Sequence, residues 1–177
     1  HGAQASNFGW HRDNYIGSTP QPNARTDSWA EFLREHRLGF QFTLAKKNGH
    51  QLGSADAGFL LQNLDAFYSD YQPRPSLLHG DLWGGNWFSD DSGAPVVFDP
   101  AVYCGDREAD LAMTELFGGF GEDFYCAYSA AWALDPGYPV RRDLHKLYHV
   151  LNHLNLFGGG YLGQARQLIN RLCAELR

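Results

Sequence analysis

The sequence predicts a mainly α-helical protein with a small β-hairpin near the middle of the chain. Apolar residues recur at helical spacing on both sides of a central stretch that is rich in glycine and aspartate. Within that stretch, two short apolar runs flank the turn-rich segment SDDSGAP, a pattern that is typical of a hairpin. Helices are expected near residues 28–47, 54–71, 107–117, 121–134, 140–157 and 161–176. Length and pattern together predict a single domain over residues 1–177.

The elements before the hairpin are predicted from their boundary residues. Residues 1–26 are rich in Gly, Pro, Asn and Ser, which predicts an extended loop region. Ser28 and Glu31 have the spacing of a capping box, so the first helix is expected to begin there. Pro73 and Pro75 predict the end of the second helix, because a proline disfavours helical backbone in the residue before it.

After the hairpin, residues 106–176 are expected to be helical, with Gly or Pro between the helices. The helix near 140–157 repeats histidine at every fourth position, so His145, His149 and His153 share one face. Such a face either packs as ordinary polar side chains or contributes to a ligand pocket. A zinc site is a third alternative, although the cysteines show no supporting pattern.

Composition and charge argue against several classes of protein. The net charge is -6 with acids and bases interspersed, which is unlike the clustered basic face of a nucleic-acid-binding protein. No apolar run approaches the ~20 residues of a membrane span, and no secretory signal opens the chain. Cys104, Cys126 and Cys173 are odd in number and widely spaced, which is typical of reduced thiols in a cytoplasmic protein.

Chemically reactive side chains gather around the predicted hairpin. Asp81 lies in the loop before its first strand, Asn86 begins that strand, and Asp99 ends the second strand. Because a turn brings the outer ends of two strands together, these side chains are expected to converge. Carboxylate and amide oxygens suit Mg²⁺, and a second carboxylate is then free to accept a proton. The alternative is a surface turn with incidental acids.

The spacing of these residues is that of phosphoryl-transfer enzymes. Protein kinases place an Asp in the catalytic loop, an Asn five residues later, and a further Asp as a metal ligand. His79, Asp81 and Asn86 reproduce the H-x-D-x4-N spacing, and an apolar strand leads into Asp99. The bare spacing also arises by chance, but the hairpin and the Asp after an apolar strand favour a kinase.

Longer segments make the comparison specific. The runs HGDLWGGNW, FDPAVYCGDREADLAMTELFGGF, DNYIGSTPQPN and LYHVLNHLNLFGGGYL resemble the fructosamine kinase (ketosamine-3-kinase) family, whose relatives are aminoglycoside phosphotransferases and choline kinases. The resemblance covers about residues 8 to 176. Choline and aminoglycoside kinases share the H-G-D-x4-N and Asp-Pro pattern, but not the run GDREADLAMTELFGGF.

The resemblance implies the C-terminal lobe of a protein-kinase-like fold and an ATP-dependent reaction. Asp81 would be the catalytic base that accepts the proton of the sugar 3-hydroxyl as it attacks ATP. Asn86 and Asp99 would hold Mg²⁺. The substrate would be a small-molecule ketosamine or a glycated lysine on a protein, and the activity would serve deglycation.

The resemblance also assigns supporting roles. His79 and Asp110 would brace the catalytic loop, with Asp110 buried and bound to backbone N–H groups; the alternative for Asp110 is an acid that complements the helix dipole. Trp83 and His153 are expected to contact the sugar, and the alternative for both is ordinary packing.

The nucleotide-binding lobe of such an enzyme is not visible in the sequence. The chain starts at His1, has Met113 as its single methionine, and shows no lysine after a V-A-I-K type strand. We therefore expect a piece of a longer protein that lacks the N-terminal lobe and is inactive alone. Its exposed lobe interface is expected to be apolar and able to pair with another copy.

Two further functions remain as alternatives. The first is another small-molecule kinase of the aminoglycoside or choline type on the same scaffold. The second is a non-catalytic binding module, which the intact set of Asp81, Asn86 and Asp99 disfavours.

Overall fold

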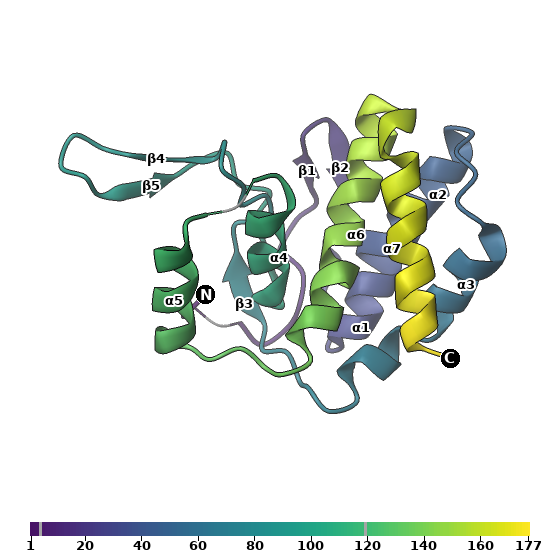
Figure 1. Cartoon of the computed structure of the whole chain (residues 1–177), viewed down its shortest axis with the longest axis horizontal. Coiled ribbons are helices and arrows are strands. Elements are labelled where there is room, and N and C mark those ends of the chain that lie inside the picture. Colours follow the sequence, from purple (N-terminus) through teal and green to yellow (C-terminus); the bar gives the residue numbers. More distant parts are fainter. Residues whose placement is uncertain (4, 119) are drawn as a thin grey trace.

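Helices dominate the computed structural model, which describes residues 1–3, 5–118 and 120–177 (Figure 1). The mainly α-helical character predicted from the sequence is confirmed. The helix α6 lies at the centre and packs against α2, α4 and α7. The helices are α1 (Trp29–Phe32), α2 (Gly39–Lys47), α3 (Ser54–Gln62), α4 (Glu108–Leu116), α5 (Glu122–Ala131), α6 (Tyr138–Phe157) and α7 (Leu162–Glu175). No helix among the described residues is both long and apolar enough to cross a membrane.

The first predicted helix is one continuous run with an irregular middle. A π-helical segment, η1 (Leu33–Leu38), joins α1 to α2. The Oγ of Ser28 accepts a hydrogen bond from the Glu31 N–H at 3.3 Å, as the capping box predicts. Gly39 follows the π segment, where a Cβ would lie only 2.3 Å from the Arg34 carbonyl oxygen. Because glycine has no Cβ, the backbone of residue 39 can lie against the Arg34 carbonyl oxygen.

The second predicted helix is shorter than expected. It ends at Gln62, and a 3₁₀ segment, η2 (Leu64–Tyr68), takes its place. The last short helix of this kind, η3 (Gly159–Tyr161), precedes α7. Apolar periodicity alone does not distinguish an α-helix from a 3₁₀ continuation, because both place residues three apart on one side.

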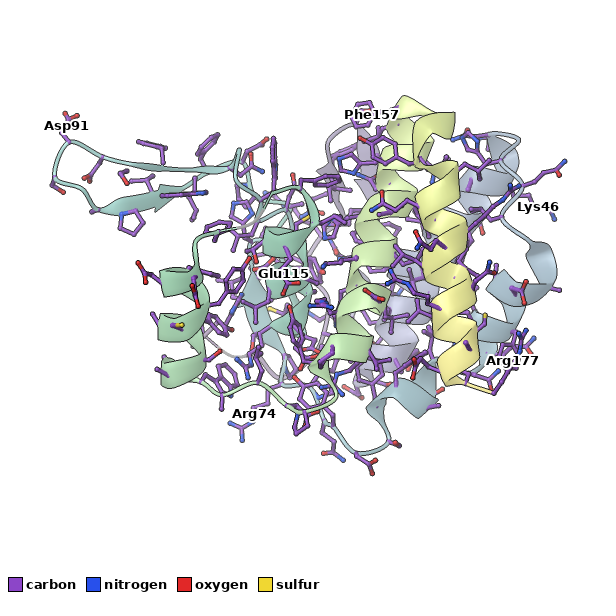
Figure 2. The ribbon with its side chains drawn as sticks, viewed as in Figure 1. Lys46, Arg74, Asp91, Glu115, Phe157 and Arg177 are labelled. Carbon is purple, nitrogen blue, oxygen red and sulfur yellow. The ribbon has the colours of Figure 1, made fainter. Side chains whose placement is uncertain are left out.

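The central hairpin is confirmed. Strand β4 (Trp87–Ser89) pairs antiparallel with β5 (Pro95–Val97), and the pair projects from the helical body with Asp91 at its tip (Figure 2). Its aromatic and aliphatic residues are exposed: Trp87, Phe88, Val97 and Phe98. Trp87 stacks on Phe120, and the rest of this apolar surface is exposed among the described residues.

Two further strand pairs were not predicted. Strand β3 (Ser76–Leu78) pairs antiparallel with β6 (Tyr103–Gly105). Strand β1 (Asn14–Ile16) pairs with β2 (Thr19–Gln21), so the prediction of a wholly extended loop over residues 1–26 is wrong in this part. Each strand has three residues, too few to show an alternating pattern. The first hairpin is held by side chains as well, since Asn14 Nδ2 donates to Val102 O at 2.7 Å and Gln21 Nε2 to Ala101 O at 3.1 Å.

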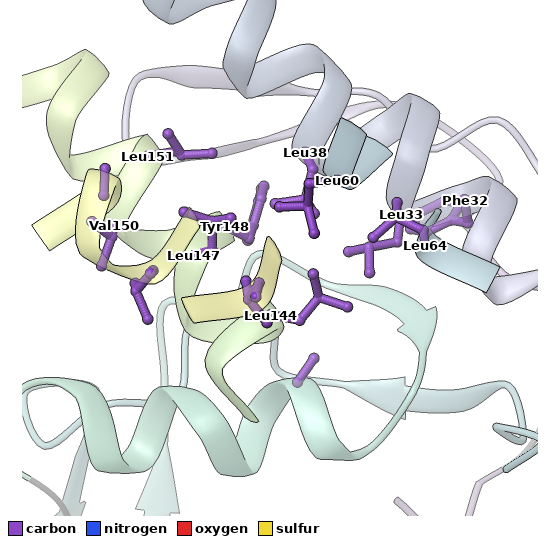
Figure 3. Close-up of a cluster of buried hydrophobic side chains, with 14 of the residues drawn as sticks. Phe32, Leu33, Leu38, Leu60, Leu64, Leu144, Leu147, Tyr148, Val150 and Leu151 are labelled. Carbon is purple, nitrogen blue, oxygen red and sulfur yellow. The ribbon is translucent and has the colours of Figure 1, made fainter. Parts of the chain in front are cut away.

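The main core lies between α6 and the helices of the first half of the chain (Figure 3). Leu144, Leu147 and Leu151 form the apolar stripe of α6 and are fully buried. The side chains opposite come from α1, η1, α3 and η2: Phe32, Leu33, Leu38, Leu60 and Leu64. This burial holds α6 rigidly, and α6 in turn supports α4, which carries several buried charges.

A buried ion pair joins α4 to α6. Arg141 Nε donates to Glu108 Oε2 at 2.7 Å, and Arg141 Nη2 donates to Glu108 Oε1 at 3.0 Å. Both residues are almost completely buried. Arg141 also donates to Asp135 and lies over the ring of Tyr71. The guanidinium therefore pairs with two carboxylates and contacts three segments at once.

Removing the cation from this pair is expected to cost much more than removing one at the surface. We predict that Arg141→Met lowers the free energy of unfolding by about 3–5 kcal/mol, because Glu108 would keep a buried, unpaired charge. The matched control is Arg177→Met, whose partner Asp56 is exposed, with an expected cost of about 0–1 kcal/mol. Urea unfolding measures both variants, and equal losses would contradict the prediction.

Candidate active site

The predicted catalytic loop, which contains His79, Gly80 and Asp81, begins where β3 ends. Leu78, the last residue of β3, pairs with Tyr103, the first residue of β6. The residues after β3 therefore lie beside the residues before β6, and this pairing brings the loop that contains Asp81 next to the segment that contains Asp99. The sequence analysis expected the hairpin to bring these two segments together. In the structure the β3–β6 pairing contributes to this as well.

Asp81 and Asn86 are in direct contact. The Nδ2 of Asn86 donates to the Asp81 carbonyl oxygen at 2.9 Å and to Asp81 Oδ2 at 3.2 Å. Asn86 is buried, whereas Asp81 is half-buried and open on one side. Burial raises the pKa of Asp81, while His153, His79 and the amide of Asn86 oppose the rise and Asp99 adds to it. Asn86 thus contacts the Asp81 carboxylate directly, and the three other residues act on it through their charge.

His79 ties the loop to the hairpin. Its Nε2 lies 2.8 Å from the Phe98 carbonyl oxygen, and its Nδ1 accepts the Asp81 N–H at 3.3 Å. This pair of contacts assigns the ring proton to Nε2, because a carbonyl oxygen can only accept. The backbone of Asn86 adds a further link, since its carbonyl oxygen accepts the Phe98 N–H at 3.1 Å.

The carboxylate of Asp110 lies behind the loop. Asp110 Oδ2 accepts the His79 N–H at 2.8 Å, and Asp110 Oδ1 accepts the Gly80 N–H at 2.8 Å. Burial raises the pKa of Asp110, and the N–H groups of Gly80 and His79 oppose that rise. Asp110 is 2% exposed. Its carboxylate is therefore committed to the loop backbone rather than to solvent.

Gly80 is required by two independent constraints. Its φ is +80°, and a Cβ at this position would lie 2.1 Å from the Ala101 carbonyl oxygen. A side chain would thus separate the loop from the segment before β6.

Asp99 has a backbone conformation that is rare for its residue type. Its φ is 54°, and it is the one non-glycine residue with positive φ among the described residues. Such conformations cost about 1–3 kcal/mol and cluster at functional sites. The side chain is exposed at the base of the hairpin and lies close enough to Asp81 to raise its pKa. The strain therefore points to a functional reason for this backbone shape.

The two residues expected to contact the sugar come from different elements, the loop after β3 and the helix α6. Trp83 is 38% exposed, and its N–H donates to the Asp81 carbonyl oxygen at 3.2 Å. His153 lies on α6, where its Nδ1 is 2.8 Å from the His149 carbonyl oxygen. Among the groups that oppose the rise in the pKa of Asp81, His153 has the largest effect, so both residues influence the surroundings of the candidate base.

An aromatic group around His153 was missed by the sequence analysis. The ring centroid of His153 lies 4.5 Å from that of Phe117, 5.4 Å from Phe157 and 5.2 Å from Tyr161. Phe157 is 68% exposed. The run LNLFGGGYL contains two of these rings: Phe157 lies one helical turn after His153 on α6, and η3 between α6 and α7 brings Tyr161.

The three histidines of α6 do not form a metal site with one another. Among the described residues, one group of three has potential ligand atoms within 4.8 Å of one another: Asp106, Glu108 and His145. Arg141 already holds Glu108 through both carboxylate oxygens. The geometry thus gives no support to zinc on the histidine face.

The donors of the hairpin site suit Mg²⁺. The contacts of Asn86 with Asp81 use its Nδ2, which leaves Oδ1 as a hard oxygen donor. The exposed carboxylate of Asp99 supplies a second oxygen from the other strand. One carboxylate and one neutral oxygen match the few protein ligands that Mg²⁺ takes beside phosphate.

A half-buried carboxylate next to such donors is typical of the catalytic loop of kinase-like phosphotransferases. The family model of fructosamine kinase matches residues 1–175, and the chain belongs to the fructosamine kinase family. The resemblance noted in the sequence is thereby confirmed.

Individual relatives agree with this assignment. The chain is 50% identical over 167 residues to a protein of Synechocystis sp. named a probable ketoamine kinase, covering 94% of this chain and 56% of the relative. It is 45% identical over 170 residues to the chloroplastic protein-ribulosamine 3-kinase of Arabidopsis thaliana, covering 96% of this chain and 52% of the relative. The chain thus spans about half the length of these curated relatives.

Solved structures show the same fold. A structure from Thermobifida fusca, described as a fructosamine-3-kinase, superposes with a TM-score of 0.89 at 36% identity, covering 99% of this chain and 61% of that one. A second, from Haemophilus somnus, gives a TM-score of 0.89 at 34% identity, with 97% and 59% coverage.

Gly80 and Gly49 have nearly the same φ, so alanine at each position tests whether the close approach of the loop at Gly80 matters. We predict that Gly80→Ala lowers the free energy of unfolding by about 3 kcal/mol, the upper end of ordinary substitutions, because the new Cβ overlaps the Ala101 carbonyl. Gly49 has a φ of +82° but open space around a Cβ, so Gly49→Ala is expected to cost only about 1 kcal/mol. Denaturant unfolding compares them. Indistinguishable costs would show that the close approach at Gly80 does not matter.

The strain at Asp99 predicts that a glycine variant is more stable than an alanine variant, the reverse of the usual order. Asp99→Gly is expected to be more stable than Asp99→Ala by about 1 kcal/mol, because only glycine relaxes at positive φ. At Asp91, which has no positive φ, the same two substitutions should favour alanine. Thermal unfolding of the four variants checks the order, and a preference for alanine at both positions would argue against strain.

Proposed function

We propose that this chain provides the catalytic loop of an ATP-dependent kinase that phosphorylates a sugar hydroxyl of fructosamines and related ketosamines, at oxygen 3. The main observation in favour is the grouping of Asp81, Asn86 and Asp99 in a chain of the fructosamine kinase family. The names ketoamine kinase and protein-ribulosamine 3-kinase, borne by its relatives, support the substrate class and the position.

In this proposal Asp81 acts as the general base. Its half-buried carboxylate accepts the proton of the attacking hydroxyl, and its raised pKa makes it a better acceptor than a fully solvated aspartate. The Asn86 amide and the His79 ring fix the orientation of Asp81. The base therefore needs no rearrangement of this chain before it meets the substrate.

The metal would be held by Asn86 and Asp99. When bound, Mg²⁺ would neutralise part of the phosphate charge of ATP. The role of this chain is then to present two hard oxygens from adjoining strands beside the base, and the strained backbone of Asp99 serves that placement.

The sugar would lie between Trp83 and His153. Aromatic faces pack well against the apolar side of a sugar ring. Trp83 offers an exposed face on the loop side, and the rings around His153 provide a second wall. Phe157, the most exposed of these rings, would face the group attached to the sugar nitrogen. A free ketosamine and a glycated lysine both fit an opening of this kind.

We further propose that an N-terminal lobe supplies the contacts to the ATP phosphates. The chain spans about half the length of its curated relatives. Its own lysines are poorly placed: Lys46 and Lys47 end α2, and Lys146 pairs with Glu115 at 3.0 Å. The exposed apolar face of the β4–β5 hairpin would pack against that lobe or, without it, against a second copy. The three free cysteines accord with a cytoplasmic setting.

The test is phosphorylation by the whole protein that carries this chain. With Mg·ATP and fructosyl-lysine we expect a 3-phosphate product, and Asp81→Asn should lower kcat by about 10²–10⁴-fold, the usual contribution of a general base. Asp91→Asn makes the same change at the exposed hairpin tip and should leave kcat unaltered (Figure 2). The 177-residue chain alone is expected to turn over negligibly.

Other outcomes separate the alternatives. Activity that survives in Asp81→Asn would refute the base while keeping the substrate class. Turnover of choline or an aminoglycoside instead of ketosamines would replace the proposed substrate. Inactivity of the whole protein with all three substrate classes would favour a non-catalytic binding module.

A further inference from the structure

The carboxylate of Asp110 has a third partner, which comes from the first residue of the chain. His1 Nε2 lies 2.9 Å from Asp110 Oδ2, and His1 Nδ1 lies 2.6 Å from the hydroxyl of Tyr128 on α5. Since an ionised carboxylate can only accept, Nε2 donates to Asp110. In the neutral ring, Nδ1 then accepts the proton of the Tyr128 hydroxyl. Tyr128, His1 and Asp110 thus form a continuous hydrogen-bonded series.

Backbone contacts hold His1 at this place. The Leu77 N–H donates to the Ala3 carbonyl oxygen at 2.9 Å, and the Ala5 N–H donates to the Pro75 carbonyl oxygen at 2.9 Å. The first residues therefore run along β3, the strand that leads directly into the catalytic loop. Figure 1 shows the N-terminus between β3 and α5. The ring of His1 is mostly buried and meets that of Tyr128 edge to face.

The partners of each carboxylate oxygen explain why this contact matters. Asp110 Oδ1 has the Gly80 N–H, whereas Asp110 Oδ2 is shared between the His79 N–H and His1. The loop supplies one N–H to each carboxylate oxygen. His1 adds a side-chain contact from outside the loop, and its own bond to Tyr128 restrains the imidazole ring.

We propose that His1 is a positioning residue of the catalytic loop: it fixes the Asp110 carboxylate, which holds the backbone of His79 and Gly80 and so sets the place of Asp81. The effect on catalysis rests on the proposed function, but the effect on the loop does not. In the proposed function the sugar lies between Trp83 and His153, so this series would act through the loop and not on the substrate itself. The loop is instead anchored to α5 through one imidazole.

The first test measures the loop directly, in the whole protein, by hydrogen exchange at the His79 and Gly80 amides. In His1→Ala we expect both amides to exchange about tenfold faster, since local opening sets such rates. His1→Gln keeps a donor near the position of Nε2 and should restore most of the protection. His11→Ala is the matched control, because His11 is an exposed histidine of the same segment.

The second test uses kinase kinetics. His1→Ala should lower kcat for the ketosamine about tenfold with little change in KM, and His1→Gln should recover most of it. Tyr128→Phe is expected to give a smaller loss of the same kind. If the protein phosphorylates no ketosamine, the exchange measurement still decides the positioning role.

Three results would overturn the proposal. One is unchanged exchange at His79 and Gly80 in His1→Ala. Another is faster exchange spread evenly over the whole protein, which would make His1 an ordinary stabilising residue. The third is failure of His1→Gln to restore protection while the protein remains folded, because a donor to Asp110 would then not be the relevant feature.

Discussion

The geometry of the candidate site depends on one buried carboxylate that binds two consecutive backbone N–H groups. Asp110 holds His79 and Gly80, and these residues immediately precede Asp81. A carboxylate that accepts backbone N–H groups in a buried place has little freedom to move, because losing either bond leaves a buried charge poorly satisfied. The loop can come this close only because residue 80 is a glycine. The position of α4 and the shape of the loop that contains Gly80 therefore depend on each other.

The helix that carries Asp110 is unusually rich in buried charge. Asp106 and Glu108 are also fully buried near its start, and each is bound by a side chain from another segment. Tyr71 donates to Asp106, and Arg141 holds Glu108. The helix dipole alone does not account for this arrangement, since it would act equally on solvated acids. The acids at the start of α4 connect it to α6, to the segment after η2, and to the catalytic loop.

Long periodic segments and the spacing of polar residues were the predictable part of this protein. The helices from α4 to α7 and the hairpin have strong local signals, and the spacing of His79, Asp81 and Asn86 is visible in the sequence alone. The β3–β6 pair could not be found in the same way, because each strand has three residues and the partners are far apart in sequence. His1 was missed for a related reason: a single histidine in a loop gives no local pattern, and its partners Asp110 and Tyr128 come from two distant helices.

Asp81, the proposed base, and Asp99, the proposed metal ligand, are held in place by very different contacts. Asp81 lies on a loop fixed by Asp110, His79 and Asn86, all of which belong to this chain. Asp99 is exposed, strained, and located at the foot of a hairpin whose apolar side chains are uncovered. A strained residue keeps its conformation only when its surroundings enforce it. Asp81 is thus held by contacts within this chain, and we expect Asp99 to gain further constraint when another surface covers the hairpin. This asymmetry provides a physical reason for expecting metal binding and turnover to depend on a second lobe, even though the base is already in place.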